Sequence, residues 1–562
     1  MTLDGAALSG CSALAGSVTC PTAGLSQGGH TINVSVSDSA GNTSSAAGSF
    51  FIDTAPPLVS ALQPSGRGNS SSPQVSAAFA DPSPASGINS ATAQVKLDGA
   101  VLSGCSSTAS GINCPTGTLA PGLHTIAVQV SDFAGNTGAA SGSFDVSRNY
   151  YWTWYDSASS GYTDWILMAN QSLSGTPDLW FNLLIASLSK PMSSLSGYQP
   201  GQVPAASVLT NAYPGTVGGP VEAVSTTGSN AVLSQRTLLA SGSLEEVAPA
   251  EESALSDHYY WAWYDSASAG TTDWVMVANQ NPSSVYYEVR IAGQLKTTGT
   301  LASGGVATPT YSGLSGGPVE VQAWTSSSKQ TAAKVVVTQR VTTNSGGALN
   351  DLPGTPADQL SSGYLWTWYD NYSTGAYDWV MLVNQNATPI YYELSVAGQL
   401  KANGALNAGA FATPQFVGLI GGPVKVNAWT SPTKQTPAKI VASQRVLFGP
   451  SFEEIPGKPE TSLKSNYSWP WYDNQTSGAY DWVMVSNTNT TSVYYEIKIA
   501  GQLKASGIIQ PGAYVTPEFT GLKNGPVEVQ AWTDSNKQTT AKVLASQRVL
   551  WNGYFNEVWG SN

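Results

Sequence analysis

Four pairs of aspartates with one shared spacing are the residues of this chain whose types and positions could carry out chemistry. The two members of each pair lie eight residues apart; the pairs are Asp156/Asp164, Asp265/Asp273, Asp370/Asp378 and Asp473/Asp481. Two carboxylates held near one another could act as the acid and the base of glycoside hydrolysis. They could also bind calcium, which takes oxygen ligands from Asp and from backbone carbonyls.

A structural role explains these aspartates better than either chemistry. Enzymes seldom need an array of identical active sites, and the loop inside each pair lacks the dense Asp and Asn pattern of strong calcium loops. An Asp at a strand end caps turn amides, and a charge in a charge-poor chain is typically paired. We therefore expect one Asp of each pair to bond to the arginine that recurs as Arg236, Arg340, Arg445 and Arg548.

The aspartates belong to a larger repeat that reads Trp-x-Trp-Tyr-Asp, then a loop, then Asp-Trp. The middle Trp of successive copies (Trp154, Trp263, Trp368 and Trp471) are 109, 105 and 103 residues apart, and such self-similarity indicates a domain array. We place the four units at residues 149–240, 257–343, 362–449 and 465–562, the last with a C-terminal tail.

After each unit, two acidic or amide residues stand between apolar ones. We call these stretches the closing segments: Leu244–Val247, Leu349–Leu352, Phe452–Ile455 and Phe555–Val558. We expect each to dock on the unit that it follows, which would make the array a semi-rigid rod.

Alternating apolar and polar residues predict that the units are built of strands. In the second unit the expected strands are 260–265, 273–279, 285–292, 295–301, 306–311, 319–325 and 334–341. No helical periodicity occurs, so each unit should be an antiparallel sandwich or closed barrel. The same alternation puts Trp261 and Trp263 on the core side, and the variable position between them on the solvent side.

A third Trp falls on the polar side of its strand in the last three units. Trp324 alternates with Glu320 and Gln322, opposite a run of Val and Ala. An indole beside acceptor groups is what a saccharide platform needs. The candidate ligand-binding residues are therefore Trp324, Trp429, Trp532, Tyr286, Tyr391, Tyr494, Glu320 and Gln322. The alternative is that a neighbouring domain or linker covers this Trp, and the first unit lacks it.

Residues 1–54 and 55–147 are two copies of another unit. Cys11/Cys20 and Cys105/Cys114 have equal, local spacing, which predicts one disulfide in each copy and an oxidising compartment. The strand at His30-Thr31-Ile32 and the turn Asp38-x-Ala40-Gly41-Asn42-Thr43 recur 94 residues later.

On these motifs, residues 1–147 resemble the bacterial immunoglobulin-like domains that are strung together in surface proteins and adhesins. The resemblance implies a sandwich of about seven strands, with the first copy, 1–54, truncated. The Trp-x-Trp-Tyr-Asp units are similar to repeats of secreted bacterial proteins, to which we assign no function.

Composition argues against several classes of function. The net charge is -12 and charged residues are 10% of the chain, so a nucleic-acid groove is not expected. No apolar run reaches membrane-spanning length. With three His in all, no Ser-His-Asp set or His-rich metal site can form in the repeats. We expect no cofactor and no metal, with calcium as the alternative.

The sequence therefore predicts an all-β, tandem array of immunoglobulin-like and related antiparallel β-sandwich domains, extracellular or at the cell surface. We expect a non-catalytic stalk, adhesin or filament-forming protein. Its expected partners are a surface polymer or further copies of itself. The alternative is a carbohydrate-binding array attached to an enzyme outside this sequence.

Overall fold

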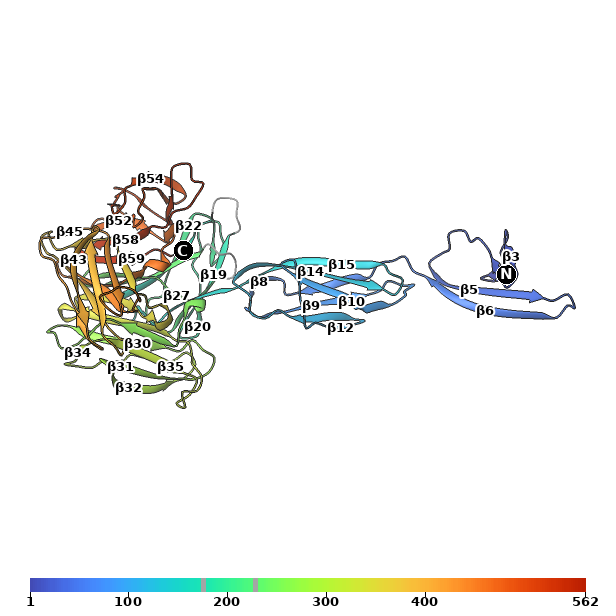
Figure 1. Cartoon of the computed structure of the whole chain (residues 1–562), viewed down its shortest axis with the longest axis horizontal. Coiled ribbons are helices and arrows are strands. Elements are labelled where there is room, and N and C mark those ends of the chain that lie inside the picture. The colour runs from blue at the N-terminus through green and yellow to red at the C-terminus, as the bar shows by residue number, and fades with distance from the viewer. Residues whose placement is uncertain (173–177, 226–230, 562) are drawn as a thin grey trace. The chain divides into compact units, whose positions relative to one another are not determined.

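The computed structural model describes residues 1–172, 178–225 and 231–561, which fall into two compact units divided after Ser147 (Figure 1). The described chain is all-β, as predicted. Its helical elements are four single 3-10 turns: η1 (Glu252–Ala254), η2 (Asn344–Gly346), η3 (Ala357–Gln359) and η4 (Glu460–Ser462). Within the described residues, no helix has the length and apolar character needed to cross a membrane.

The first unit contains the two short copies, each with its expected disulfide, Cys11–Cys20 and Cys105–Cys114. Residues 1–54 form one sheet in the order β2-β1-β5-β6 and a hairpin, from β1 (Thr2–Leu3), β2 (Ala6–Ala7), β3 (Ser12–Leu14), β4 (Ser17–Thr19), β5 (Gly28–Ser37) and β6 (Thr43–Ile52).

Residues 55–147 form a two-sheet sandwich, ordered β11-β10-β14-β15-β8 and β12-β13-β9-β7. Its strands are β7 (Leu58–Gln63), β8 (Gly66–Asn69), β9 (Gln74–Ala80), β10 (Ile88–Leu97), β11 (Ala100–Val101), β12 (Ser106–Thr108), β13 (Gly111–Pro115), β14 (Gly122–Asp132) and β15 (Thr137–Val146). Alternate residues of β14 (Ile126, Val128 and Val130) are buried in its core.

In the second unit, the repeats are numbered 1 to 4 in chain order, and repeat 2 shows their common plan. Two antiparallel sheets, β32-β31-β35-β28-β38 and β33-β30-β36-β37, enclose the core, and a short ladder, β29-β34, joins the aspartate loop to its neighbour. The strands are β28 (His258–Trp261), β29 (Tyr264–Asp265), β30 (Thr272–Ala278), β31 (Val285–Ile291), β32 (Gln294–Leu301), β33 (Val306–Ala307), β34 (Ser315–Gly316), β35 (Val319–Trp324), β36 (Val336–Thr343), β37 (Ala348–Pro353) and β38 (Thr355–Pro356).

The other repeats keep this plan. Repeat 1 has β16 (Arg148–Trp152), β17 (Tyr155–Asp156), β18 (Tyr162–Asn170), β19 (Leu179–Ile185), β20 (Leu188–Lys190), β21 (Gln202–Val203), β22 (Ser207–Ala212), β23 (Val217–Gly218), β24 (Val221–Ser225), β25 (Ala231–Leu239), β26 (Leu244–Val247) and β27 (Ala250–Glu251). Repeat 3 has β39 (Gly363–Trp366), β40 (Tyr369–Asp370), β41 (Ala376–Val383), β42 (Ile390–Val396), β43 (Gln399–Leu406), β44 (Phe411–Ala412), β45 (Ile420–Gly421), β46 (Val424–Trp429), β47 (Val441–Phe448), β48 (Ser451–Pro456) and β49 (Lys458–Pro459). Repeat 4 has β50 (Asn466–Trp469), β51 (Tyr472–Asp473), β52 (Ala479–Ser486), β53 (Val493–Ile499), β54 (Gln502–Ile509), β55 (Tyr514–Val515), β56 (Lys523–Asn524), β57 (Val527–Trp532), β58 (Leu544–Trp551) and β59 (Tyr554–Trp559).

The closing segments dock on their own repeats, as expected, and do so as full sheet strands. β37 pairs with β36, and β26, β48 and β59 pair with their counterparts in the same way. The first Trp of each motif fixes this strand from inside the core. Trp261 is 2% exposed and its indole nitrogen donates to the Leu352 carbonyl at 2.9 Å.

The position between the two motif Trp was expected to face solvent, and that expectation is wrong. Thr153, Ala262, Thr367 and Pro470 are all buried. Thr367 shows the reason, because its hydroxyl bonds to Ser546 and Glu557 of repeat 4 at 2.9 and 2.7 Å. Thr153 makes the equivalent contact with Thr338 of repeat 2 at 3.0 Å, so this position lies at a repeat boundary rather than in water.

The four repeats close into a ring, and the expected semi-rigid rod is wrong for this part of the chain. The closing strands lie side by side in the order β26, β37, β48 and β59, and β59 returns to β26. Repeat 4 joins repeat 1 where the Glu246 backbone nitrogen donates to Asn556 Oδ1 at 3.2 Å. Every repeat therefore has two neighbours, so its motif residues can contribute to a boundary as well as to a core.

Candidate functional site

The second aspartate of each pair is buried beneath the loop that the first one caps. Asp378 Oδ2 accepts hydrogen bonds from the Asp370 backbone nitrogen at 2.6 Å and from Gln444 Nε2 at 2.9 Å. Asp370 Oδ1 accepts bonds from the backbone nitrogens of Tyr372 and Ser373. The other three repeats make the same contacts. Both aspartates thus hold the loop between two strands, which is a turn-capping geometry.

One oxygen of the buried aspartate has no hydrogen-bond partner in any repeat: Oδ1 of Asp164, Asp273, Asp378 and Asp481. Loss of hydration on burial raises the pKa of Asp378 and of Asp481 to about 7, and that of Asp164 to about 6. Burial likewise raises the pKa of Asp273 well above its usual value. An unpaired buried oxygen in all four copies favours the protonated carboxyl over the carboxylate.

The recurring arginine does not bond to the aspartates of its own repeat, in contrast to our expectation. Arg340 instead forms a bidentate ion pair with Asp351 of its closing strand, with N–O distances of 2.7 and 2.6 Å. Arg236, Arg445 and Arg548 pair with Glu246, Glu454 and Glu557 in the same position. The closing strand lies hydrogen-bonded beside the arginine strand, so its acid is nearer than the aspartate loop.

Each arginine nevertheless acts on an aspartate, across the boundary with the preceding repeat. The positive charge of Arg548 in repeat 4 opposes the rise in the pKa of Asp378 in repeat 3. Arg236 in repeat 1 does so for the pKa of Asp481 in repeat 4, which follows from ring closure. The aspartates and arginines therefore meet between repeats rather than within them.

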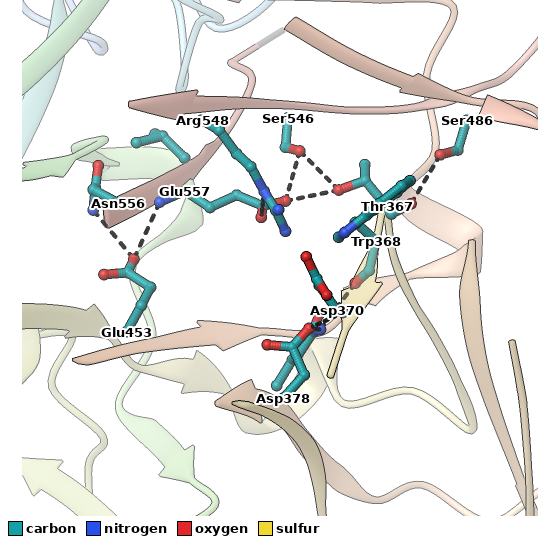
Figure 2. A network of polar contacts seen from close by, with 12 residues as sticks. Thr367, Trp368, Asp370, Asp378, Glu453, Ser486, Ser546, Arg548, Asn556 and Glu557 are labelled. Atoms are coloured by element: carbon teal, nitrogen blue, oxygen red, sulfur yellow. Dashed lines mark hydrogen bonds and ion pairs between the residues drawn. The ribbon is translucent and has the colours of Figure 1, made fainter. Parts of the chain in front are cut away.

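A cleft of about 330 Å³ separates these groups at the boundary of repeats 3 and 4. Trp368, Asp370 and Asp378 line it from repeat 3, while Trp482 and Arg548 line it from repeat 4. Figure 2 shows the Arg548 guanidinium and the Trp368 indole reaching toward the two carboxylates. The cleft thus combines flat apolar surfaces with a hydrogen-bond donor and acceptors, the arrangement of a small polar ligand's site.

Two further boundaries carry clefts of the same kind. The cleft between repeats 2 and 3 measures about 480 Å³ and is lined by Asp265, Trp379 and Arg445. The cleft between repeats 4 and 1 measures about 220 Å³. Its lining includes Asp473, Lys523, Trp471, Trp165, Trp551 and Arg236. In each case one repeat supplies the first aspartate of its pair, and the next supplies an indole and the arginine.

The indole that follows the second aspartate (Trp165, Trp274, Trp379 or Trp482) was not selected from the sequence. It stands between the buried Asp and a buried Val or Ile, so strand alternation places it on the opposite face. This alternation is visible in the sequence of all four repeats. The sequence does not show which aspartate the arginine faces, because the arginine of one repeat faces the aspartate of the preceding repeat.

The aromatic residues predicted to form a saccharide platform lie together as an aromatic cluster on a separate surface of repeats 2 to 4. Tyr286 and Trp324 are cross-strand neighbours with ring centres 6.2 Å apart. Lys329 Nζ lies 5.1 Å from the Trp324 ring centre and pairs with Glu288. Repeats 3 and 4 repeat the cluster with Tyr391, Trp429, Lys434 and Glu393, and with Tyr494, Trp532, Lys537 and Glu496. The lysine and the glutamate were not selected from the sequence.

This aromatic cluster is less open than the sequence suggested. The ammonium of Lys329 occupies space over the indole that a sugar ring would need. The two polar candidates beside it are also engaged, because Glu320 and Gln322 both contact the His258 ring, at 2.8 and 3.2 Å. The clefts between repeats 2 and 3 and between repeats 3 and 4 instead place an indole, a carboxylate and a guanidinium together, and no lysine is among their described lining residues.

A group that could hold a metal ion occurs among the described residues of the first unit. Carboxylate oxygens of Asp53, Asp81 and Asp132 lie within 4.8 Å of one another. Several are already bonded, since Asp53 accepts from the Ser86 backbone and Asp132 from Asn136. An all-oxygen set of this kind suits calcium better than a transition metal.

No family model matches the chain, and no curated protein matches its sequence. Among solved structures, Bacteroides ovatus SGBP-B of a mixed-linkage glucan utilization locus, in complex with a mixed-linkage heptasaccharide, is 11% identical, with a TM-score of 0.13, over 69% of this chain and 99% of that one. The M60 catalytic domain with CBM51-1 and CBM51-2 from Clostridium perfringens ZmpB is 10% identical, with a TM-score of 0.14, over 90% of this chain and 55% of that one. TM-scores this low carry no argument about fold or function.

Proposed function

We propose that the chain is a non-catalytic adhesion module that works outside the cell, and that its ring binds a neutral polysaccharide in the clefts between repeats. The two disulfides of residues 1–147 support an oxidising, extracellular setting. The net charge of -12 disfavours a polyanionic partner.

The observation that carries this proposal is the recurrence of one cleft chemistry at three boundaries. Each cleft presents an indole for the face of a sugar ring, a carboxylate to accept from its hydroxyls and a guanidinium to donate to them. A polymer of repeating sugars can occupy several such clefts at once, so modest affinity at each adds to strong attachment.

The state of the aspartate pairs supports a binding role over catalysis. In repeat 3, Asp378 is fully buried and bonded to the Asp370 backbone, so the cleft presents the Asp370 carboxylate without the second carboxyl group that glycoside hydrolysis requires. The same arrangement stands in all four repeats, whereas an enzyme needs one well-placed pair.

Replacing the indoles of the clefts tests the proposal. The triple variant Trp165→Ala, Trp379→Ala, Trp482→Ala should lose binding to a soluble neutral glucan or mannan that the unchanged chain retains. We expect about a tenfold or greater fall in affinity, because each lost indole removes about 1 kcal/mol or more of stacking. Affinity electrophoresis of the full chain in gels containing the polysaccharide measures it.

The aromatic cluster supplies the matched control. The triple variant Trp324→Ala, Trp429→Ala, Trp532→Ala removes the same number of half-buried indoles from the same repeats or their neighbours. Binding that survives in this control and fails in the cleft variant supports the cleft site. Loss only in the control would move the site to the aromatic cluster. Retention in both, or reducing sugar released from the polysaccharide, would overturn the proposal.

A further inference from the structure

The four closing strands bring one polar side chain each to the middle of the ring. These are Glu245, Asn350, Glu453 and Asn556, the first of the two polar residues in each closing segment. Their exposed fractions are 3%, 1%, 2% and 1%. Carboxylate and amide therefore alternate around the axis, and Figure 2 shows two of the four, Glu453 and Asn556, in contact.

Hydrogen bonds run around this axial group from repeat to repeat. Asn556 Nδ2 donates to Glu245 and to Glu453, both at 3.1 Å, so the two carboxylates flank one amide. The amide oxygens are used by neighbouring backbone: Asn350 Oδ1 accepts from Glu454 at 3.1 Å, and Asn556 Oδ1 from Glu246 at 3.2 Å. The amides orient the carboxylates but bring no positive charge.

The basic side chains nearby are already committed. Each of the four recurring arginines pairs with the acid at the second polar position of a closing segment. In the part of the chain that the structure describes, no ion pair joins Glu245 or Glu453 to a basic side chain. Two buried carboxylates thus lack a counter-charge, and a buried charge without a partner is strongly unfavourable.

Two independent features of the axis are those of a binding site. Glu453 Oε2 is buried and has no hydrogen-bond partner. A cavity of about 90 Å³ adjoins it, lined by closing strands of all four repeats, with Glu245, Asn350, Glu453 and Trp559 among its residues. This volume accommodates an ion with a few water molecules.

We propose that the axial cavity is a cation site in which Glu245 and Glu453 hold one calcium ion, together with water. Calcium takes oxygen ligands in flexible geometry, and a site with two protein carboxylates belongs with the weaker, roughly 10⁻⁴ to 10⁻³ M, extracellular sites. The ion joins repeat 1 to repeat 3 across the ring.

The ring can be observed separately from the other acidic group, because every Trp lies after residue 151 and none in residues 1–147. Thermal unfolding of the full chain, followed by Trp fluorescence, should shift upward by about 2 to 5 °C when calcium exceeds its dissociation constant about tenfold. The variant Glu245→Gln, Glu453→Gln should lose this shift. The control Asp81→Asn, in the first unit, should keep it.

Terbium, which replaces calcium, gives a second measurement that needs no carboxylate variant to fold. Trp559 lines the cavity, so excitation of Trp should produce terbium emission that calcium displaces and that Trp559→Phe weakens. Two outcomes would overturn the site: a calcium shift of equal size in the double Gln variant, or no shift with calcium in the unchanged chain.

Discussion

At the scale of single residues, the second aspartate of each pair is buried at a cost in lost hydration. Asp378 and Asp481 keep one oxygen bonded to a backbone amide and a glutamine, but leave the other without a partner. Burial favours the protonated carboxyl over the carboxylate, and it therefore raises the pKa of each aspartate to about 7.

The ring should therefore lose stability as the pH rises. The folded pKa of about 7 lies above the value of 3.8 for an exposed Asp, so the stabilisation is complete below about pH 4 and is lost as the pH rises through about 7. Each group contributes at most about 1.4 kcal/mol per pH unit in that window. Unfolding temperatures read by Trp fluorescence between about pH 4 and 8 measure it.

The variant Asp378→Asn, Asp481→Asn should flatten this pH profile, because an amide does not titrate. Asp534→Asn, at an exposed turn carboxylate, is the control and should leave the slope unchanged. A profile for the double Asn variant that parallels the unchanged chain would show that these two aspartates are already ionised in the folded ring.

Residue-level prediction from sequence succeeded where the contact is local and failed where it crosses a boundary. The capping of turn amides by Asp370 depends on residues two and three positions away, so spacing alone could predict it. The partner of Arg548 could not be found in this way. It bonds to Glu557 in its own closing strand and faces Asp378 of another repeat.

At the scale of elements, the closing strands do more than end each repeat. In β59, Glu557 is 7% exposed and bonds to Arg548 at 2.7 Å. Its other oxygen accepts from Thr367 of repeat 3 and from Ser546, each at 2.7 Å. Glu557 thus joins the closing strand to its own sheet through Arg548 and to the preceding repeat through Thr367.

Removing one partner of this pair should be far worse than removing both. Arg548→Met leaves Glu557 buried and charged, and should cost about 3–5 kcal/mol of unfolding free energy. Arg548→Met with Glu557→Leu should recover most of that loss. Urea unfolding followed by Trp fluorescence gives the three values needed.

Arg290→Met, at the more exposed pair with Glu288, is the comparison and should cost less than about 1 kcal/mol. Equal losses at Arg290 and Arg548 would contradict the role given to the closing strand. So would a double variant no more stable than Arg548→Met alone.

The strands themselves were predictable from alternation, including the third strand of repeat 2, which was expected at 285–292 and spans Val285–Ile291. Their outward faces were not, because alternation separates two sides of a sheet without saying what covers either. Thr367 was expected in water and is buried against repeat 4. The strand face that carries Trp324 was predicted to be polar. Alternation did not show that Lys329, from the turn after this strand, lies over the Trp324 ring.

At the scale of the whole molecule, the sequence predicted four similar modules but not that they close on themselves. Closure rests on contacts between residues about three hundred positions apart, such as Asn556 with Glu245 and Glu246. No periodic signal marks such a contact, since an open array of the same repeats would have the same spacing. The clefts and the axial site depend on this closure.

An engineered disulfide between repeats 1 and 4 tests ring closure most directly. A Cβ placed on Gly242 would lie 3.5 Å from the Cβ of Asn552, within the range for a disulfide, and because Gly242 has φ +97° the single variant Gly242→Cys should also lower stability. All four native cysteines are already paired, so new thiols are unambiguous. In Gly242→Cys, Asn552→Cys we expect an intramolecular disulfide, seen by mass spectrometry of non-reduced peptides, with each single variant keeping its free thiol. Two free thiols under oxidising conditions, or bonds only between separate chains, would show that the repeats form an open array and contradict the ring.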